Sequence, residues 1–292
     1  MGLVERLVRR PGNLIESGAP LMPRAAATPA VIAMLTDFGY RDHYAGVMKG
    51  VISAIAPATQ VLDLTHGIPA GQISAGAIAL AQSWRFFPPR TIFLAVVDPG
   101  VGTRRRAIAI ASRAGARFVG PDNGLLWMAA AAAGIESIVE LQTARYRLPE
   151  PSATFHGRDI FAPAAAWLSR RVKLGALGPQ RKQLTRLDIA DGVSETARML
   201  KGAVVYVDGF GNLVTNLSRA AVERFAARQR QDRLSVRIGR HSPIAIYNAY
   251  AEAPAGAPLA LVGSFGMLEI AVRDGNAAAR FTVTAGAPVS LG

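Results

Sequence analysis

The sequence predicts an α/β N-terminal domain with a mostly parallel sheet, followed by a small antiparallel β-barrel-like C-terminal domain. Two observations lead to this prediction. From Val31 to about Arg171, apolar strand-like runs alternate with alanine-rich helical stretches, as in parallel sheets covered by helices on both faces. After Met199 the apolar runs become short and are separated by Gly, Pro, Asn or Asp, which is typical of antiparallel β domains.

The first region supplies strands and helices in alternation. Continuous apolar runs predict buried strands, because a strand covered on both faces has no polar side. The predicted strands are Val31–Thr36, Val61–Leu64, Thr91–Val97, Ala107–Ser112 and Arg117–Val119. Longer stretches rich in Ala, Leu and Ile predict the intervening helices. The predicted helices are Tyr44–Ala56, Gln72–Ser83, Leu125–Ala133 and Ile160–Arg171.

The second region predicts mostly strands, with one helix at Arg219–Arg230. Its predicted strands are Ala203–Val207, Leu234–Ile238, Ile244–Tyr247, Leu259–Gly263, Leu268–Val272 and Phe281–Thr284. The domain organisation that follows has four parts. These are a disordered basic extension over residues 1–30, the α/β domain over 31–172, a polar linker over 173–198 and the β-rich domain over 199–292.

Composition excludes several classes of protein. The 292 residues carry a net charge of +13, but the arginines are scattered without an interleaved aromatic stripe, so no nucleic-acid partner is predicted. The chain has no cysteine, which excludes disulfides and thiolate metal sites. No uncharged apolar run approaches the ~20 residues of a membrane-spanning helix. The first thirty residues lack the apolar core of a signal peptide. A cytoplasmic protein is therefore expected, with Met22 and Met34 as alternative start sites.

Three strand-like runs end in an aspartate that is followed by a glycine-containing turn. These aspartates are Asp37, Asp98 and Asp208. After Asp98, Gly100 and Gly102 allow the backbone to approach whatever binds there. Ligands of open α/β sheets bind at the carboxyl ends of the strands. The three runs therefore predict one polar site built from dispersed segments, as in an enzyme.

Metal-dependent phosphohydrolysis is one interpretation of the polar residues. Its candidate ligands are Asp37, Asp63, His66, Asp98, Asp122, Asn123 and His156. Asp63 and His66 are separated by two residues, which places them on opposite faces of an extended strand. This spacing does not suit a dinuclear centre. We expect His66 to cap the turn before Gly67, and Asp122 and Asn123 to form a tight turn.

The other interpretation needs no metal. It combines Asp98, the arginine run 104–106 and His156 with Asp37 and Asn212. With these residues in view, the chain resembles the S-adenosyl-L-methionine (SAM) hydroxide adenosyltransferases, which are adenosine-forming SAM hydrolases related to the SAM-dependent fluorinase and chlorinase. The resemblance spans roughly Val31 to Ala279. The matching segments, in order, are Thr36–Gly39, Asp42, Met48–Gly50, Asp63–His66, Val97–Thr103, Pro121–Gly124, Thr154–Pro163 and Asp208–Asn216.

The resemblance implies hydrolysis of SAM to adenosine and L-methionine, by attack of water or hydroxide on ribose C5′. It implies no cofactor and no metal. It also implies a homotrimer, in which each active site lies between the N-terminal domain of one subunit and the C-terminal domain of a neighbour. The catalytic Asp–Arg–His set of the family falls on Asp98, Arg105 and His156. Arg104 and Arg106 flank the chosen arginine, so the register is open, and both are expected to be solvated surface charges.

The same resemblance assigns the substrate contacts. Asp37 binds the ribose diol, Asp42 and Asp208 pair with the methionine ammonium, Ser264 binds the methionine carboxylate, and Asn212 binds an adenine edge. A carboxylate suits a diol because it accepts two hydrogen bonds, and an amide suits adenine because it both donates and accepts. The structural alternative is that Asp37 and Asp208 only cap turns.

Two departures from the halogenases favour water as the nucleophile. Halide-using relatives carry an aromatic residue where this chain has Asp98, and a serine where it has Gly157. A carboxylate repels a halide in a site of low dielectric constant. The alternative from another class is a regulator that binds SAM or adenosine with little turnover, which a turnover assay distinguishes from a hydrolase.

Overall fold

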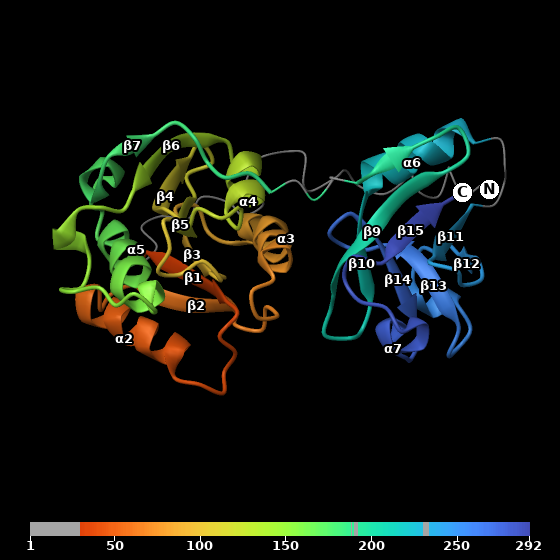
Figure 1. Ribbon diagram of the computed structural model, residues 1–292, viewed down its shortest axis with the longest axis horizontal. Coiled ribbons are helices and arrows are strands. Elements are labelled where there is room, and N and C mark those ends of the chain that lie inside the picture. Colours follow the sequence, from red (N-terminus) through yellow and green to blue (C-terminus); the bar gives the residue numbers. More distant parts are fainter. Residues whose placement is uncertain (1–29, 188, 190–191, 230–233) are drawn as a thin grey trace. The chain divides into compact units, whose positions relative to one another are not determined.

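The computed structural model describes residues 30–187, 189, 192–229 and 234–292 (Figure 1). Residues 1–29, which make up almost all of the predicted basic extension, lie outside the described residues. The described residues form two compact units, one up to Leu187 and one beyond it. We call them the N-terminal unit and the C-terminal unit, and each is described by itself.

The described part of the N-terminal unit holds a seven-stranded sheet. In spatial order its strands are β2 (Gln60–Thr65), β1 (Val31–Thr36), β3 (Ile92–Val96), β5 (Arg117–Pro121), β4 (Ala107–Ser112), β6 (Ile135–Glu140) and β7 (Gln180–Arg181). The first four are mutually parallel. Strand β4 is antiparallel to both β5 and β6, and β7 is antiparallel to β6. Most strands therefore share one direction, and the prediction of a mostly parallel sheet is confirmed.

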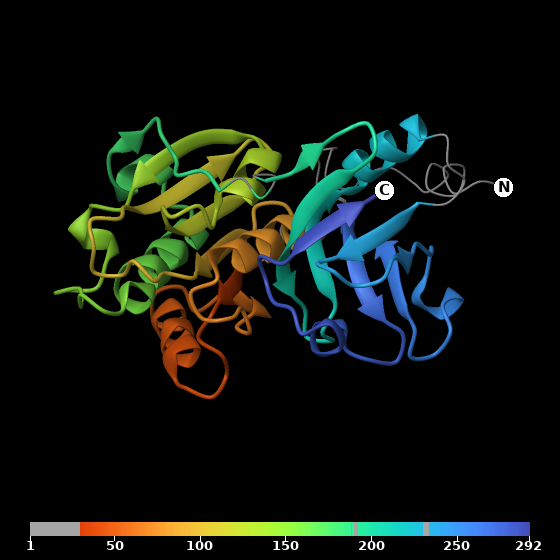
Figure 2. The same cartoon turned by 45° about the vertical axis from the view of Figure 1, so that its right-hand side comes forward.

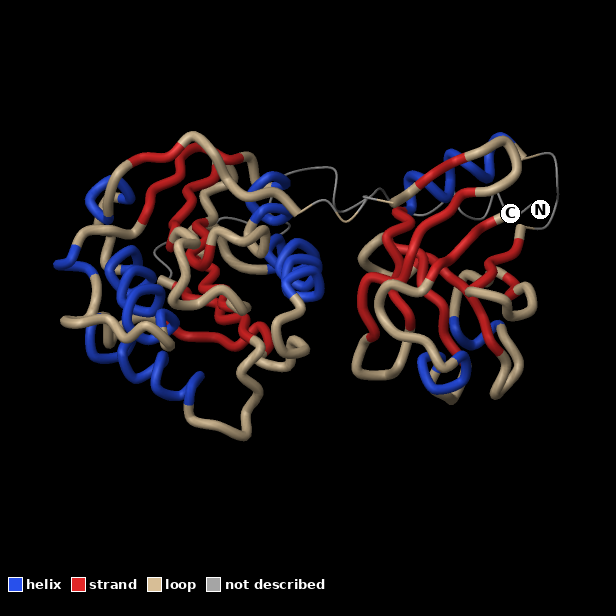
Figure 3. Tube along the Cα trace, viewed as in Figure 1, coloured by secondary structure: helices blue, strands red, loops and turns tan. Residues whose placement is uncertain are grey.

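Helices cover both faces of this sheet, as Figures 1 and 3 show. Helices α2 (Tyr44–Ile55) and α5 (Ala162–Ser169) pack on one face. Helix α2 buries Ala45, Met48 and Ile52, the i, i+3, i+7 spacing of an amphipathic helix. Helices α3 (Ile73–Ser83) and α4 (Trp127–Ala132) lie on the other face.

Glycine sets how closely α3 approaches the sheet. A Cβ atom added to Gly76 would lie 2.8 Å from Cδ1 of Leu125 and 3.2 Å from Cγ2 of Val97. The helix therefore rests almost directly on the segment that follows β3. The end of that segment is fixed as well, because Nδ2 of Asn123 donates to the carbonyl oxygen of Val97 at 2.8 Å. Asp98, the next residue, thus leaves the sheet at a constrained point.

The C-terminal unit is an antiparallel, nearly closed sheet, as predicted. Among its described residues, the strand order is β12 (Ile244–Ala245), β11 (Ser235–Ile238), β15 (Pro288–Leu291), β9 (Leu200–Val207), β10 (Leu213–Ser218), β14 (Met267–Val272) and β13 (Pro258–Val262), with β8 (Ser194–Glu195) paired to β9. Ile246 bridges Ala260 of β13, and the amide of Tyr247 donates to the Ala260 carbonyl at 2.8 Å. These contacts join the two ends of the strand order (Figure 2).

Helix α6 (Arg219–Arg228) covers the core of this unit with Val222 and Phe225. It begins at Ser218, whose side chain accepts the amide of Ala221 at 3.2 Å, as expected for a serine N-cap. The strand predicted at Phe281–Thr284 is wrong. Phe281 ends helix α7 (Ala277–Phe281), and Thr282 has a left-handed φ of 54°, which stops regular structure there.

The segment 173–198, predicted as a linker, contributes two short strands. Strand β7 pairs with β6, and β8 pairs with β9. No helix among the described residues is long and apolar enough to span a membrane.

Candidate active site

A pocket of about 430 Å³ opens within the N-terminal unit, at the carboxyl ends of β1 and β3. Its walls come from the turns after these strands, from the start of α2 and from the segment before α5. The lining residues are Asp37, Phe38, Tyr44, Gly71, Val96, Asp98, Pro99, Val101, Thr154, Phe155, His156 and Gly157. Of the three strand-end aspartates that were expected to form one site, Asp37 and Asp98 line this pocket at the carboxyl edge of the sheet, and Asp208 is not among the lining residues.

The turn after β3 folds Arg105 back onto Asp98. Gly102 has a φ of 78°, and a Cβ atom there would lie 2.5 Å from the carbonyl oxygen of Ala153, so only glycine fits. Nε of Arg105 donates to both carboxylate oxygens of Asp98 at 2.9 and 3.0 Å, and Nη2 donates to Oδ2 at 2.6 Å. The two side chains are 10% and 6% exposed. Removal from water strengthens such a pair but requires that both partners be present.

His156 joins this pair through Arg105. Nη2 of Arg105 lies 2.6 Å from Nδ1 of His156. Arginine has only donors, so Nδ1 must accept, and the proton of the neutral ring then resides on Nε2. Burial lowers the pKa of His156, and the nearby Arg105 cation lowers it further, against the raising effect of Asp98. The ring is therefore held neutral with an N–H donor at Nε2.

The structure brings together Asp98, Arg105 and His156, and it distinguishes the three consecutive arginines. Arg104 is exposed, as expected. The expectation that Arg106 is a solvated surface charge is wrong. Its Nε donates to Oδ2 of Asp122 at 2.8 Å, and the Asp122 side chain is only 1% exposed. A buried carboxylate needs such a partner, so Arg106 is occupied away from the pocket.

Asp37 lines the pocket, and its Oδ2 accepts the amide of Gly71 at 2.8 Å. This bond ties the turn after β1 to the loop before α3. Asp42 is exposed and does not line the pocket. Its predicted contact with the methionine ammonium stays a prediction.

Sequence reasoning did not single out the aromatic wall of the pocket. The ring centroids of Phe38, Tyr44 and Phe155 lie 5.2 to 5.9 Å from one another. Two of these residues are adjacent in sequence to site residues, since Phe38 follows Asp37 and Phe155 precedes His156. That adjacency was the available signal. Such rings exclude water from the part of the pocket that they line.

The predicted separation of Asp63 and His66 on opposite faces of a strand is wrong. Nε2 of His66 lies 3.0 Å from Oδ1 of Asp63. The pairing register between β1 and β2 shifts between Asp63 and Thr65, and His66 lies just beyond the strand. The alternation of an ideal strand therefore does not apply. Within the described part of the chain, no group of three or more His, Cys, Asp or Glu side chains is arranged to hold a metal ion.

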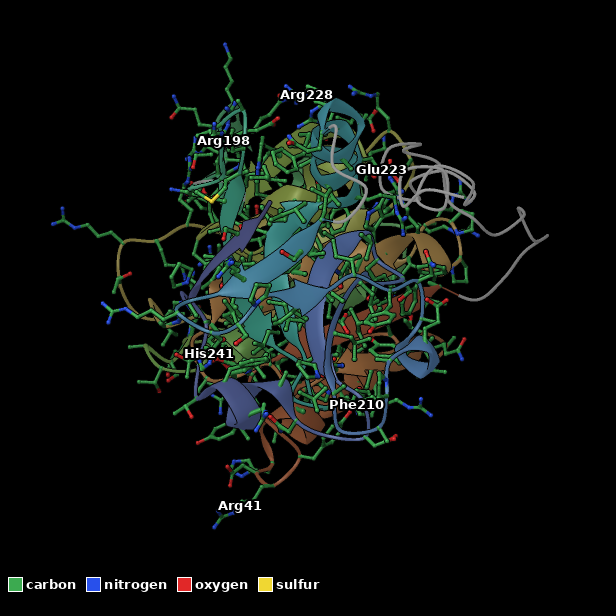
Figure 4. All side chains as sticks on the ribbon, turned by 90° about the vertical axis from the view of Figure 1, so that its right-hand side faces the viewer. Arg41, Arg198, Phe210, Glu223, Arg228 and His241 are labelled. Carbon is green, nitrogen blue, oxygen red and sulfur yellow. The ribbon has the colours of Figure 1, made fainter. Side chains whose placement is uncertain are left out.

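Asp208, Asn212 and Ser264 belong to the C-terminal unit. Oδ1 of Asp208 accepts the amides of Phe210 and Asn212, and Oδ2 accepts Nδ2 of Asn212 at 2.9 Å. Asp208 thus caps its own turn, whose tip carries Phe210, 81% exposed (labelled in Figure 4). Ser264 is exposed in the turn between β13 and β14. The substrate contacts assigned to these residues stay predictions.

The fold and the pocket define an α/β enzyme with a compact Asp–Arg–His group and a β-barrel-like second unit. The chain belongs to the SAM hydroxide adenosyltransferase family. The model of the family's N-terminal domain matches residues 32–178, and that of its C-terminal domain matches residues 202–290.

Relatives of known name agree with this membership. The chain is 38% identical over 269 residues to the (R)-S-adenosyl-L-methionine hydrolase of Thermus thermophilus, covering 89% of this chain and 98% of that protein. It is 40% identical over 258 residues to the protein of the same name from Salinispora tropica, covering 87% and 95%. A fluorinase from Actinoplanes is 25% identical over 288 residues, covering 89% and 97%.

A solved structure shares the fold. The crystal structure of an uncharacterized conserved protein from Thermotoga maritima is 35% identical to this chain and superposes with a TM-score of 0.81. The match covers 89% of this chain and 100% of that one.

Proposed function

We propose that this protein hydrolyses SAM to adenosine and L-methionine by attack of water on ribose C5′. The observation that carries the proposal is the group of Asp98, Arg105 and His156 at the wall of the pocket. Family membership supports it, together with relatives named (R)-S-adenosyl-L-methionine hydrolase that align over nearly their full length.

The chemistry of the substrate fits this group. In the displacement, the water oxygen bonds to C5′, the C5′–S bond breaks, and its electron pair returns to sulfur. Methionine leaves as a neutral thioether, so the leaving group needs no general acid. The attacking water must instead be oriented and must lose a proton. These are the demands that a positioned donor and a carboxylate meet.

We assign a role to each of the three residues. His156 donates from Nε2 to the water oxygen and fixes its position, because Nδ1 is occupied by Arg105. Arg105 stabilises hydroxide character as the water loses its proton. Asp98 holds Arg105 through its bidentate contact, and as a carboxylate at the pocket wall it receives the proton.

The substrate is held by the rest of the pocket and by the second unit. Asp37 accepts from the ribose diol, with its carboxylate oriented by the Gly71 amide. We assign Asp42 and Asp208 to the methionine ammonium, Ser264 to its carboxylate and Asn212 to adenine. A homotrimer with active sites at the subunit interfaces is part of the proposal, as is a cytoplasmic location. Light scattering on the purified protein tests the oligomer through the mass of three chains.

The experiment that tests the function is direct. Purified protein is treated with a chelator and incubated with each sulfonium epimer of SAM, because the names of the relatives specify the (R) form. Products are separated by chromatography. Equal amounts of adenosine and methionine support the proposal. Tight binding of SAM or adenosine without turnover would instead identify a regulator and overturn it.

A further inference from the structure

His66 is a fully buried histidine outside the pocket that the proposed chemistry does not use. Both of its ring nitrogens are occupied. Nδ1 lies 2.8 Å from Oγ1 of Thr36, and Nε2 lies 3.0 Å from Oδ1 of Asp63. Thr36 is also fully buried and is the last residue of β1, so the residue after it is Asp37.

The donor and the acceptor in each hydrogen bond of His66 follow from the charge of Asp63. Burial raises the pKa of Asp63, but hydrogen bonds from Lys49 and His66 lower it, and the net change is downward. The anionic carboxylate only accepts, so Nε2 of His66 carries a proton, and in the neutral ring Nδ1 is then an acceptor. The hydroxyl of Thr36 therefore donates to Nδ1. Its oxygen in turn accepts the amide of Phe38 at 3.2 Å.

This chain of bonds surrounds the backbone of Asp37. The amide of Phe38 on one side of Asp37 is fixed by Thr36, and the amide of Gly39 donates to the His66 carbonyl at 2.7 Å. His66 also begins the loop that reaches Gly71, whose amide holds the Asp37 carboxylate at 2.8 Å. The two segments that determine where Asp37 points are thus both anchored at His66.

We infer that His66 is a positioning residue for substrate binding. With Thr36 and Asp63 it holds the Asp37 turn and the Gly71 loop in register, so that the Asp37 carboxylate is presented to a ribose diol. The inference rests on the proposed function, since it concerns how the same site holds the nucleoside. His66 thus orients Asp37 from outside the pocket, because it is not one of the lining residues.

The link through Thr36 makes a specific prediction about substitutions. His66→Gln keeps a donor near the position of Nε2 but loses the acceptor at Nδ1. His66→Asn keeps an acceptor near Nδ1 but loses the contact with Asp63. Thr36→Val keeps the shape of the side chain and removes the hydroxyl. If His66 acts on Asp37 through its hydrogen bond to Thr36, then His66→Gln and Thr36→Val weaken adenosine binding. His66→Asn should retain much of the wild-type affinity.

Two measurements on the full-length protein test this. Calorimetry gives the adenosine dissociation constant, and steady-state assays give kcat and KM for SAM. In His66→Gln and in Thr36→Val we expect both the dissociation constant and KM to rise about tenfold, roughly the effect of one hydrogen bond, with kcat changed less than ~3-fold. The double variant should be no weaker than either single variant, because both break the same link.

Thr59→Val is the matched control. Oγ1 of Thr59 lies 2.8 Å from Oγ of Ser169, and Thr59 directly precedes β2, at the sheet edge opposite the pocket. This variant loses one side-chain hydrogen bond within the N-terminal unit, whereas Thr36→Val loses the bond to His66 and the acceptor of the Phe38 amide. Thermal unfolding records the stability of each variant. A loss of stability lowers the Tm of both variants, whereas only Thr36→Val should change adenosine affinity.

The outcomes are distinguishable. If the wild-type protein hydrolyses SAM but His66→Gln and Thr36→Val bind adenosine as tightly as Thr59→Val, the role of His66 is wrong and the proposed function stands. A fall in kcat at unchanged KM would also contradict the role. If the wild-type protein neither turns over SAM nor binds adenosine, the proposed function fails and the inference fails with it.

Discussion

Nη2 of Arg105 lies 2.6 Å from Nδ1 of His156, so a donor occupies the ring nitrogen at which the neutral imidazole takes up a proton. The same nitrogen of Arg105 contacts Oδ2 of Asp98. The arginine thus joins a carboxylate to a neutral histidine. The charges of these three groups, an anionic carboxylate, a cationic guanidinium and a neutral imidazole, determine how the site should respond to pH and to substitution.

The first prediction concerns the titration of His156. Burial and Arg105 lower the pKa of His156 below its ordinary value of 6.5, so the neutral ring persists as the pH falls through 6.5. Activity that needs neutral His156 is then flat at neutral pH and falls only in more acidic solution. NMR titration of the four histidines should show His156 titrating below the ordinary value. Arg105→Gln removes one lowering cause and should shift its pKa upward. A wild-type pKa at or above 6.5 would contradict the geometry.

The second prediction separates catalysis from binding. Asp98→Ala and His156→Ala should lower kcat by ~10²–10⁴, the usual contribution of a positioned acid or base, while adenosine affinity changes little. Both residues address the water rather than the nucleoside. Asp98→Ala should also lower stability, because Arg105 is left buried without its partner. Single-turnover kinetics and calorimetry measure the two effects. A KM effect that exceeds the kcat effect would show that these residues bind substrate instead.

The third prediction compares two aspartates. Asp37→Ala should weaken adenosine binding ~10- to 100-fold, since it removes charge-assisted hydrogen bonds to the diol. Asp42→Ala is the matched variant. It should leave adenosine binding unchanged and weaken only SAM, because Asp42 is assigned to the methionine end. Equal adenosine affinity in both variants would remove Asp37 from the ribose site.

The parts of the fold with strong local patterns were predictable. Strand β1, buried along its whole length, and helix α2, with its amphipathic spacing, lie within a residue of their predicted bounds. Strand β10 was missed because it contains buried polar residues, Thr215 and Asn216, which a hydrophobicity pattern reads as a turn. Their hydrogen bonds to Leu268 and Ala203 are tertiary contacts that no local window contains.

The site shows the same division. Strand ends indicated Asp37 and Asp98 because the carboxyl edge of a sheet is a general property of the fold. Arg105 rather than Arg106 belongs to the site because its guanidinium contacts His156, which lies 51 residues further along the chain. The pairing of Asp63 with His66 depended on a register shift between β1 and β2. Neither relationship is visible in spacing along the chain.

The fourth prediction concerns divalent metals. Asp63 and His66, two of the candidate ligands, are hydrogen-bonded to each other. Asp63 also accepts from Lys49, and His66 also contacts Thr36. They are therefore not available to a metal without losing these partners. We expect SAM turnover to be unchanged after treatment with EDTA and after addition of Mg²⁺, Mn²⁺ or Zn²⁺. Loss of activity on chelation that one of these ions restores would replace the metal-free mechanism.

The identity of the nucleophile tests the central claim most directly. The protein is incubated with SAM in ¹⁸O-labelled water, with and without saturating fluoride or chloride. The mass of the nucleoside product is then measured by mass spectrometry. The Asp98 side chain is 6% exposed at the pocket wall. Arg105 offsets part of its charge, but a halide in contact with the carboxylate oxygens is still repelled by them, whereas water donates to them. The account predicts adenosine carrying one ¹⁸O atom and no halogenated nucleoside. Unlabelled adenosine, or a 5′-halogenated product formed at a comparable rate, would contradict it.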